Sequence, residues 1–258
     1  MALKGRVSRL GAGALTTSSV TGQHNATNSL VNEIIRASKD LHLSGTLSRR
    51  AYRSLARHLS ARRVDYSAET GAGASTLLFS QLSSHHTVFA LDGGCGSVNN
   101  VRVSPFLKTT TTTFVEGPTQ TTLPSYRFDH ALQAALLDGP HAYPFPELEY
   151  YYLYPHLEEG ALLVIDDIQI RSVYNLFCFL KAEEMFELIE VVGKTAFFRR
   201  TSVPVFCPTG DEWWTQGYNK WPILRAVWRE ALGWPLPELF KSSLKYLLRR
   251  ANVFAQRS

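Results

Sequence analysis

The sequence predicts an α/β fold built on a doubly wound, mostly parallel sheet of seven strands, with one antiparallel strand at its edge. Three observations predict this fold. Strand-like and helical runs alternate from residue 61 to residue 200, a Gly-x-Gly turn joins the first strand to a helix, and acidic residues follow several strands. Such alternation is typical of parallel sheets, because a helix provides the crossover between two parallel strands.

The expected elements follow from the spacing of apolar residues. Apolar residues recur at helical spacing from about residue 28 and again over 48–59, before the alternation begins. Only Gly193 and Lys194 separate the last two strand-like runs, which predicts a hairpin and therefore the antiparallel strand. The expected strands cover 64–69, 87–92, 111–116, 132–138, 161–166, 186–192 and 195–200, and the expected helices between them cover 75–82, 145–157 and 172–185.

Composition divides the chain into three parts. Residues 1–60 are interpreted as a flexible lead-in and a helical cap, and residues 61–200 hold the alternating elements. Residues 201–258 contain all five tryptophans and a basic amphipathic run over 238–254. We expect this run to dock on the body of the protein, and contact with a membrane surface is the less favoured alternative. The tryptophans either wall a ligand pocket or pack within a C-terminal cap.

Composition also argues against several classes of protein. The chain of 258 residues is 45% hydrophobic, enough for a full core, yet it has no apolar run of about 18 residues that would span a membrane. Its three cysteines lack Cys-x-x-Cys spacing, which disfavours a disulfide framework or a zinc site. The first residues lack the apolar centre of a signal peptide, so we expect a cytoplasmic protein. A net charge of +5 is too mild to indicate a nucleic-acid partner.

The first functional motif is the turn after the first expected strand. Glu69 precedes Gly71 and Gly73, and a helical run begins at Ser75. Glycines allow a ligand to approach the backbone, and the first turn of a helix offers free N–H groups. Asp92 follows about 20 residues later, where an acid that binds ribose hydroxyls is expected. The motif therefore indicates a nucleotide-type ligand, with a purely structural turn as the alternative.

Two features of this turn favour a sulfonium ligand over a dinucleotide. Thr76 stands where the dinucleotide fingerprint has its third glycine. The carboxylate of Glu69 would repel a pyrophosphate but not the positive charges of S-adenosylmethionine. A nicotinamide-dependent dehydrogenase is the less favoured reading.

Acidic residues also follow two later strands that are expected to be neighbours. Asp138 follows one strand, and Asp166 and Asp167 follow the next. Carboxylates that meet at one sheet edge repel one another unless a proton or a cation intervenes, and oxygen ligands suit Mg²⁺ or a similar divalent ion. His141 lies close to Asp138 in the sequence and is a candidate general base. The alternatives are that the acids cap helices and that the histidine is structural.

Together these residues resemble the class I S-adenosylmethionine-dependent methyltransferases, which have a Rossmann-like fold. The resemblance covers about residues 65–200 and is closest to the metal-dependent O-methyltransferases of the catechol and caffeoyl-CoA type and to related sugar and macrolide enzymes. It implies that Glu69, Gly71, Gly73, Ser75, Asp92, Thr119, Gln120 and Asp138 bind S-adenosylmethionine, that Asp138, Asp166 and Asp167 bind a divalent metal such as Mg²⁺, and that Asp138 and His141 are catalytic.

The resemblance implies methyl transfer to a hydroxyl of a small metabolite or sugar. His141 stands where catechol enzymes carry a catalytic lysine. Asp138-Gly139-Pro140-His141 replaces the motif of enzymes that methylate nucleic-acid bases, so nucleic acid is an unlikely substrate. Three alternatives remain open: a metal-independent methyltransferase, a module that binds S-adenosylmethionine without catalysis, and a protein that binds a partner or a membrane through 238–254. Assembly into a homo-oligomer also remains open.

Overall fold

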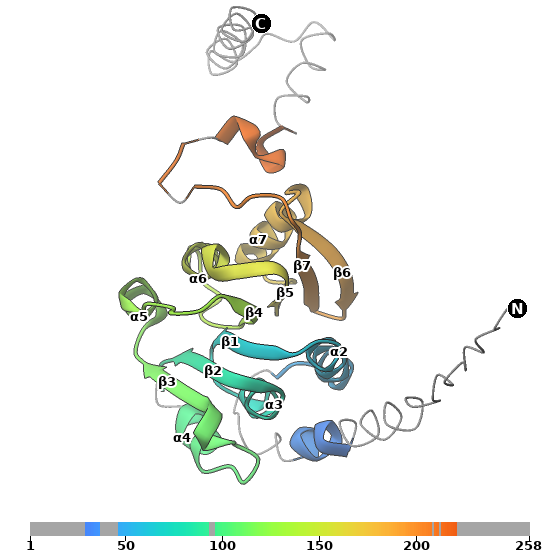
Figure 1. Ribbon diagram of the computed structural model, residues 1–258, viewed down its shortest axis with the longest axis vertical. Helices are drawn as coiled ribbons and strands as arrows, with labels where there is room; N and C mark the ends of the chain where they lie inside the picture. The colour runs from blue at the N-terminus through green and yellow to red at the C-terminus, as the bar shows by residue number, and fades with distance from the viewer. Residues whose placement is uncertain (1–28, 37–45, 93–95, 208, 212, 221–258) are drawn as a thin grey trace, which may run out of the picture.

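The computed structural model describes residues 29–36, 46–92, 96–207, 209–211 and 213–220. Its centre is a seven-stranded sheet with the order β3-β2-β1-β4-β5-β7-β6 (Figure 1). The strands are β1 (Val64–Thr70), β2 (Ser83–Ala90), β3 (Thr112–Glu116), β4 (Leu132–Leu137), β5 (Leu157–Ile165), β6 (Phe186–Val192) and β7 (Thr195–Arg200). The strand order reverses direction between β1 and β4, and this is the point where doubly wound sheets open a crevice for ligands.

The expected fold class is confirmed, and the structure adds one detail. The first five strands pair in parallel, whereas β7 runs antiparallel to both β5 and β6. The hairpin inserts β7 between β5 and β6, so that the reversed strand is second from the edge. This insertion carries the hairpin turn at Gly193 and Lys194 to the carboxyl end of β5.

The start of β2 differs from the expectation. His85 and His86 fall between the helix expected over 75–82 and the strand expected over 87–92, but they lie inside β2 and pair with Tyr66 and Ser67 of β1. His86 is buried, with its Nδ1 2.8 Å from Ser67 Oγ and its ring stacked on Phe79 at 4.7 Å between centroids. β2 therefore begins several residues before its expected start. Local sequence does not reveal this, because the contacts are made with β1 and α3.

Helices cover both faces of the sheet. The helices are α2 (Arg49–Ser60), α3 (Ala74–Leu82), α4 (Ser97–Arg102), α5 (Thr119–Ser125), α6 (Phe145–Leu153) and α7 (Arg171–Ala182). Alternate residues of the central strands serve opposite faces: Leu136 and Val164 pack in one cluster with α2 and α3, while Leu137 and Ile165 pack in another with α6 and α7. The central strands are therefore buried on both sides, as parallel strands require.

The structure describes only part of the segments that precede and follow the sheet in the sequence. Residues 29–36 are helical and contribute Val31 and Ile34 to the core beside α2. The amphipathic run at 238–254 and most of the predicted lead-in lie outside the described residues. Among the described helices, none combines the length and the apolar character needed to cross a bilayer.

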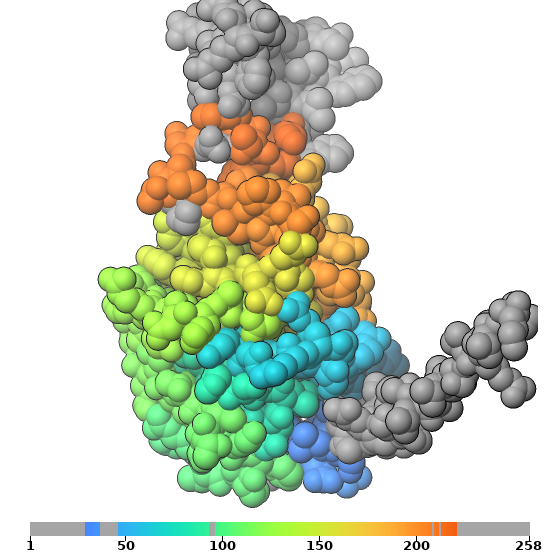
Figure 2. All heavy atoms as spheres, in the orientation of Figure 1, coloured from blue at the N-terminus to red at the C-terminus, as the bar shows by residue number. Residues whose placement is uncertain are grey.

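The segment after β7 lies against α6 and α7 (Figure 2, orange against yellow). Tyr154 Oη donates a hydrogen bond to the Phe206 carbonyl at 2.9 Å. Glu183 accepts hydrogen bonds from the backbone N–H groups of Gly217, at 3.1 Å, and Tyr218, at 2.8 Å. Because a Cβ at Gly217 would lie 2.0 Å from the Ala182 carbonyl oxygen, the glycine permits this close approach.

Candidate functional site

The glycine turn after β1 lies against the end of β4. Gly71 has a positive φ of 85°, and a Cβ at this position would lie 2.4 Å from the Asp138 carbonyl oxygen. Its N–H donates to the Phe89 carbonyl of β2 at 2.9 Å. Glycine is required here both by the backbone angle and by the space available.

Glu69 supports this turn from inside the core. Its Oε1 accepts a hydrogen bond from Thr76 Oγ1 and lies 3.1 Å from His86 Nε2, and the side chain is fully buried. Thr76 Oγ1 also accepts a hydrogen bond from the Gly73 N–H at 3.0 Å. The carboxylate therefore fixes the turn through Thr76, and it is not among the residues that line the adjacent cavity.

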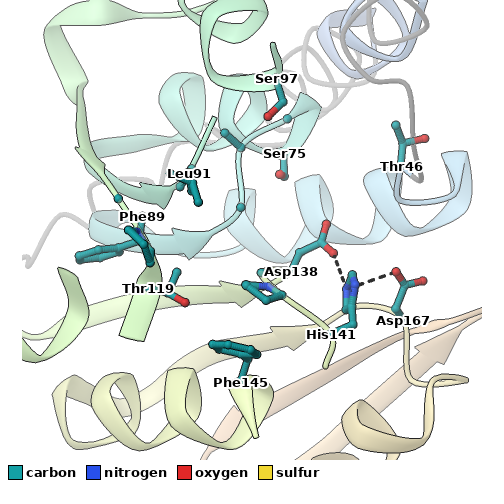
Figure 3. Close-up of a pocket in the computed structure, with 18 of the residues that line it drawn as sticks. Thr46, Ser75, Phe89, Leu91, Ser97, Thr119, Asp138, His141, Phe145 and Asp167 are labelled. Carbon is teal, nitrogen blue, oxygen red and sulfur yellow. Dashed lines mark ion pairs between the residues drawn. The ribbon is translucent and has the colours of Figure 1, made fainter. Parts of the chain in front are cut away.

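A cavity of about 630 Å³ opens at the carboxyl edge of the sheet, beside the glycine turn (Figure 3). Its volume is within the range of small-molecule binding sites. Leu91 and Phe89 lie at one part of the wall and Phe145 at another. Of the residues predicted to bind S-adenosylmethionine, those that line the cavity are Gly71, Gly73, Ser75, Thr119, Gln120 and Asp138.

Asp92 lies next to this cavity, one residue beyond Leu91. Its Oδ2 accepts a hydrogen bond from Asn99 Nδ2 at 2.8 Å. Its Oδ1 is buried and has no hydrogen-bond partner among the described residues. A carboxylate oxygen left in this state can accept a hydrogen bond from a ligand hydroxyl, so the residue fits the ribose-binding role predicted for it.

Asp138, His141 and Asp167 converge in the same cavity, with His141 between the two acids (Figure 3). His141 Nε2 lies 3.4 Å from Asp138 Oδ1 and 3.3 Å from Asp167 Oδ2. Asp138 ends β4, Asp167 follows β5, and Ser172 at the start of α7 donates a hydrogen bond to the His141 carbonyl. Neighbouring parallel strands thus bring the two acids together, as the sequence predicts.

Asp166 lies apart from this group. The residue is 1% exposed, its Oδ1 accepts a 2.5 Å hydrogen bond from Thr195 Oγ1, and its Oδ2 lies 3.1 Å from Lys194 Nζ. Asp167 has a φ of 60°, in the left-handed region, and its side chain lines the cavity, although both acids contact Lys194. The acids predicted to act as a trio are therefore divided between the cavity and the interior.

Burial and charge shift the pKa values of these groups in opposite directions. Burial raises the pKa of Asp138 to about 7, although the neighbouring His141 opposes the shift. Asp138, and then Asp167, raise the pKa of His141 against the effect of its burial. Burial would raise the pKa of Asp167, but hydrogen bonds from Lys194 and Gln169 lower it overall. Lys194 thus keeps one acid charged while Asp138 is poised to hold a proton.

The donor set of the cavity fits a divalent cation. Asp138, His141 and Asp167 each offer one ligand atom, and these atoms lie within 4.8 Å of one another. Two carboxylate oxygens and one imidazole nitrogen are ligands that divalent metals such as Mn²⁺ and Mg²⁺ accept, with water or substrate oxygens filling the other positions. Asp166 is not part of this group among the described residues.

A second buried acid stands behind the cavity wall. Glu149 of α6 accepts a hydrogen bond from Thr70 Oγ1 at 2.6 Å, and Thr70 Oγ1 in turn accepts one from the Asp138 N–H at 3.1 Å. Burial raises the pKa of Glu149 to about 7, against the effect of the hydrogen bond from Thr70. This chain of contacts links α6 to the end of β1 and to the backbone of Asp138.

Residues 68–168 match a family model described as a methyltransferase domain. The chain carries a methyltransferase domain. Its fold is the Rossmann-like methyltransferase fold. A search of curated proteins finds no match to the sequence.

Solved structures share the fold of the methyltransferase domain. Cofactor-bound Rv0187 from MTB is 13% identical, with 73% of this chain and 99% of that chain covered and a TM-score of 0.53. The O-methyltransferase TomG from Streptomyces achromogenes, involved in tomaymycin synthesis and solved with S-adenosylmethionine, is 14% identical, with 67% and 90% covered and a TM-score of 0.51. An O-methyltransferase from Bacillus cereus, solved with S-adenosylhomocysteine, is 10% identical, with 67% and 91% covered and a TM-score of 0.50.

Sequence reasoning missed three residues at the cavity of the methyltransferase domain. Thr46 and Tyr52 line the cavity, although both precede the first strand. Lys194 holds Asp166 and Asp167 from the hairpin turn. The two-residue hairpin was a usable signal for Lys194, since a turn beside the last parallel strand must lie near that strand's carboxyl end. No local pattern marks Thr46 or Tyr52.

Proposed function

We propose that this chain is an O-methyltransferase that transfers a methyl group from S-adenosylmethionine to a hydroxyl of a small metabolite or sugar, assisted by a divalent cation. One observation carries the proposal: the glycine turn and the group formed by Asp138, His141 and Asp167 line the same cavity. A donor held at the turn and an acceptor held at the acids would therefore meet in one enclosed space, where positioning contributes much of the rate.

Different residues around the turn bind different parts of S-adenosylmethionine. Gly71, Gly73 and Ser75 form the wall beside the methionine end, and Asp92 accepts hydrogen bonds from the ribose. Thr119 and Gln120, at the start of α5, flank the adenine, while Glu69 acts indirectly by fixing the turn. When bound, S-adenosylmethionine supplies an activated methyl group.

The cation would be held by Asp138, His141 and Asp167. When bound there, a divalent ion would supply Lewis acidity that favours the deprotonated form of the acceptor hydroxyl. The acids also orient the acceptor; Lys194 pairs with Oδ1 of Asp167, and Oδ2 faces His141 in the site. Asp166, which was predicted as a ligand, serves in this arrangement to anchor Lys194 and Thr195.

A second candidate is a methyltransferase that needs no metal, and Lys194 favours it. Its ammonium group already supplies positive charge to Asp166 and Asp167. In that case His141 Nε2 takes the proton of the acceptor hydroxyl, and Asp138, whose pKa is near 7, stabilises the protonated imidazole. The two candidates exclude each other at His141, because both use the same nitrogen.

Oxygen as the methylated atom is supported by the solved structures from Streptomyces achromogenes and Bacillus cereus, whose descriptions name them O-methyltransferases. We also propose that residues 61–200 bind the methyl donor and that residues 1–60 complete its cavity through Thr46 and Tyr52, whereas the described part of the extension at 201–258 lines a different cavity. We also propose a reducing compartment such as the cytoplasm, because the three cysteines are scattered and odd in number.

Calorimetry tests the proposal in two stages. S-adenosylhomocysteine is titrated into the protein first, and saturable binding with one site is expected; absence of binding at millimolar ligand would contradict the function. Mn²⁺ is titrated next into the parent and into Asp138→Asn, Asp167→Asn and Asp166→Asn. The first two substitutions should weaken Mn²⁺ binding roughly tenfold or more, whereas Asp166→Asn should weaken it less.

Activity then distinguishes the two candidates. Methyl transfer to a panel of phenols and sugars is measured before and after treatment with a chelator. Loss of transfer that Mn²⁺ restores supports the cation-assisted reaction. Undiminished transfer with the chelator, combined with inactivity of His141→Gln, supports the metal-independent reaction.

A further inference from the structure

A second cavity, of about 500 Å³, lies outside the proposed methyl-transfer site. It is bounded by α6, α7 and the segment that follows β7, and it shares no lining residue with the cavity beside the glycine turn. Seven aromatic residues form much of its wall: Tyr143, Tyr150, Tyr151, Tyr154, Phe179, Phe206 and Tyr218. Nothing in the reaction proposed above uses this space.

Ring contacts and hydrogen bonds within the protein hold the wall of this aromatic cavity in place. Tyr150 stacks on Tyr154 with 4.9 Å between ring centroids, and Phe179 packs edge-on against Tyr150 at 5.7 Å and against Tyr218 at 5.7 Å. The Tyr154 hydroxyl is bonded to the Phe206 carbonyl, and Glu183 holds the backbone of Tyr218. The rings are therefore ordered before any ligand arrives, which lowers the entropic cost of binding.

Two polar atoms at the aromatic cavity have no partner. Tyr150 is 7% exposed, and its Oη is buried without a hydrogen bond among the described residues. Glu147 Oε2 is likewise buried and unbonded. Both residues line the cavity. Leaving such atoms unsatisfied is costly, and this cost is relieved when a ligand supplies donors.

The charge of the lining selects the kind of donor. The described lining residues include no lysine, arginine or histidine. Apart from the tyrosines and Cys207, Glu147 is their only ionisable residue. The faces of aromatic rings carry negative charge density and attract cations. A cationic ligand would bind both the rings and the carboxylate, whereas an anion would be repelled by both.

We propose that the aromatic cavity binds a protonated amine with an apolar or aromatic body, whose ammonium group donates hydrogen bonds to Glu147 Oε2 and Tyr150 Oη. A quaternary ammonium ion satisfies the rings but has no N–H to donate, so it should bind less tightly. Burial raises the pKa of Glu147 in the empty cavity, and a bound ammonium group would favour its charged form. The site is independent of methyl transfer and of the cation site.

Calorimetric titration of the full chain with 2-phenylethylammonium tests the proposal, with neutral 2-phenylethanol as the ligand of matched size. The titration is run with and without saturating S-adenosylhomocysteine, which separates the aromatic cavity from the cavity beside the glycine turn. The parent should bind the ammonium about tenfold more tightly than the alcohol, and both affinities should be the same with and without S-adenosylhomocysteine.

Two variants and one control locate the binding. Glu147→Gln should weaken binding of the ammonium about tenfold and leave that of the alcohol unchanged. Tyr150→Phe keeps the ring and removes only the unbonded hydroxyl, and it should weaken the ammonium by a smaller factor. Glu187→Gln changes an exposed glutamate on β6 and should have no effect. Thermal melting confirms that each variant folds.

Three results would overturn the proposal. The first is that neither ligand binds at millimolar concentration, and the second is that the parent binds the alcohol as tightly as the ammonium. The third is that Glu147→Gln, folded like the parent, retains the full affinity for 2-phenylethylammonium. Because the readout is binding in the absence of a methyl donor, failure of the proposed methyltransferase activity would leave the test intact.

Discussion

Lys194 forms an ion pair with Asp167, with its Nζ 2.6 Å from Oδ1, and the same nitrogen lies 3.1 Å from Asp166 Oδ2. The lysine stands at the turn between β6 and β7, and the acids stand at the end of β5. The insertion of β7 beside β5 is what brings them together. One ammonium group therefore contacts two neighbouring carboxylates at the edge of the candidate site.

Replacement of Lys194 by methionine should have opposite effects on stability and on metal affinity. The buried carboxylate of Asp166 loses its charged partner, so the free energy of unfolding should fall by about 1–3 kcal/mol. A positive charge is also removed from beside the proposed ligands, so Mn²⁺ should bind several-fold more tightly. Urea unfolding and calorimetry measure the two effects. Weaker Mn²⁺ binding in a folded Lys194→Met protein would place the cation elsewhere.

Gly71→Ala should destabilise the fold and abolish binding of S-adenosylhomocysteine. The positive φ of 85° disfavours alanine, and the added Cβ meets the Asp138 carbonyl oxygen at 2.4 Å. Gly193→Ala is the matched control, because Gly193 has a φ of 65° but nothing within 4 Å of the added Cβ. The control should lose about 1 kcal/mol of stability from the backbone angle alone, and Gly71→Ala should lose clearly more. Equal losses in urea unfolding would show that the contact with Asp138 is unimportant.

Glu149 should make the protein less stable as the pH rises. Its pKa is about 7 in the folded protein and near the ordinary glutamate value of 4.5 when unfolded, so the folded state holds the extra proton between these values. Stability therefore falls as the pH increases from about 4.5 to about 7, by about 3 kcal/mol at most. Glu149→Gln should remove this part of the decline, and a difference between parent and variant that stays constant across this range would contradict the assignment. Asp138 contributes a similar slope to both proteins, so only their difference is interpreted.

Glu69→Leu should weaken cofactor binding even though Glu69 does not line the cavity. The substitution leaves His86 without its carboxylate and frees Thr76, which holds the Gly73 N–H. Leaving a buried polar group without its hydrogen-bond partner costs about 1–3 kcal/mol. Thermal unfolding and titration with S-adenosylhomocysteine are the measurements. Unchanged affinity in a folded variant would show that the turn keeps its shape without this support.

The sequence was most informative where local pattern and topology agree. The seven strands, the hairpin and the placement of Asp138 and Asp167 at one sheet edge all follow from apolar spacing and from the rule that parallel strands end together. The division of Asp166 from Asp167 could not be foreseen, because it depends on the backbone angle at Asp167 and on Thr195 and Lys194 across the hairpin.

Contacts between distant segments account for the other differences. Glu69 was expected at the ligand, but Thr76 and His86 hold it in the core, and His86 itself lies in a strand only because β1 offers Ser67. The aromatic cavity depends on how the segment after β7 folds back on α6, and hydrophobic spacing does not encode this return.

Thr46 and Tyr52 reach the donor cavity from residues that precede β1, and Lys194 reaches its rim from beyond α7. The stretch that matches the family model, residues 68–168, contains none of the three. A recombinant fragment trimmed to that stretch would lack the part of the cavity wall formed by Thr46 and Tyr52. It would also lack the positive charge of Lys194 beside Asp167. Expression for assays or crystallisation should therefore retain at least residues 46–200.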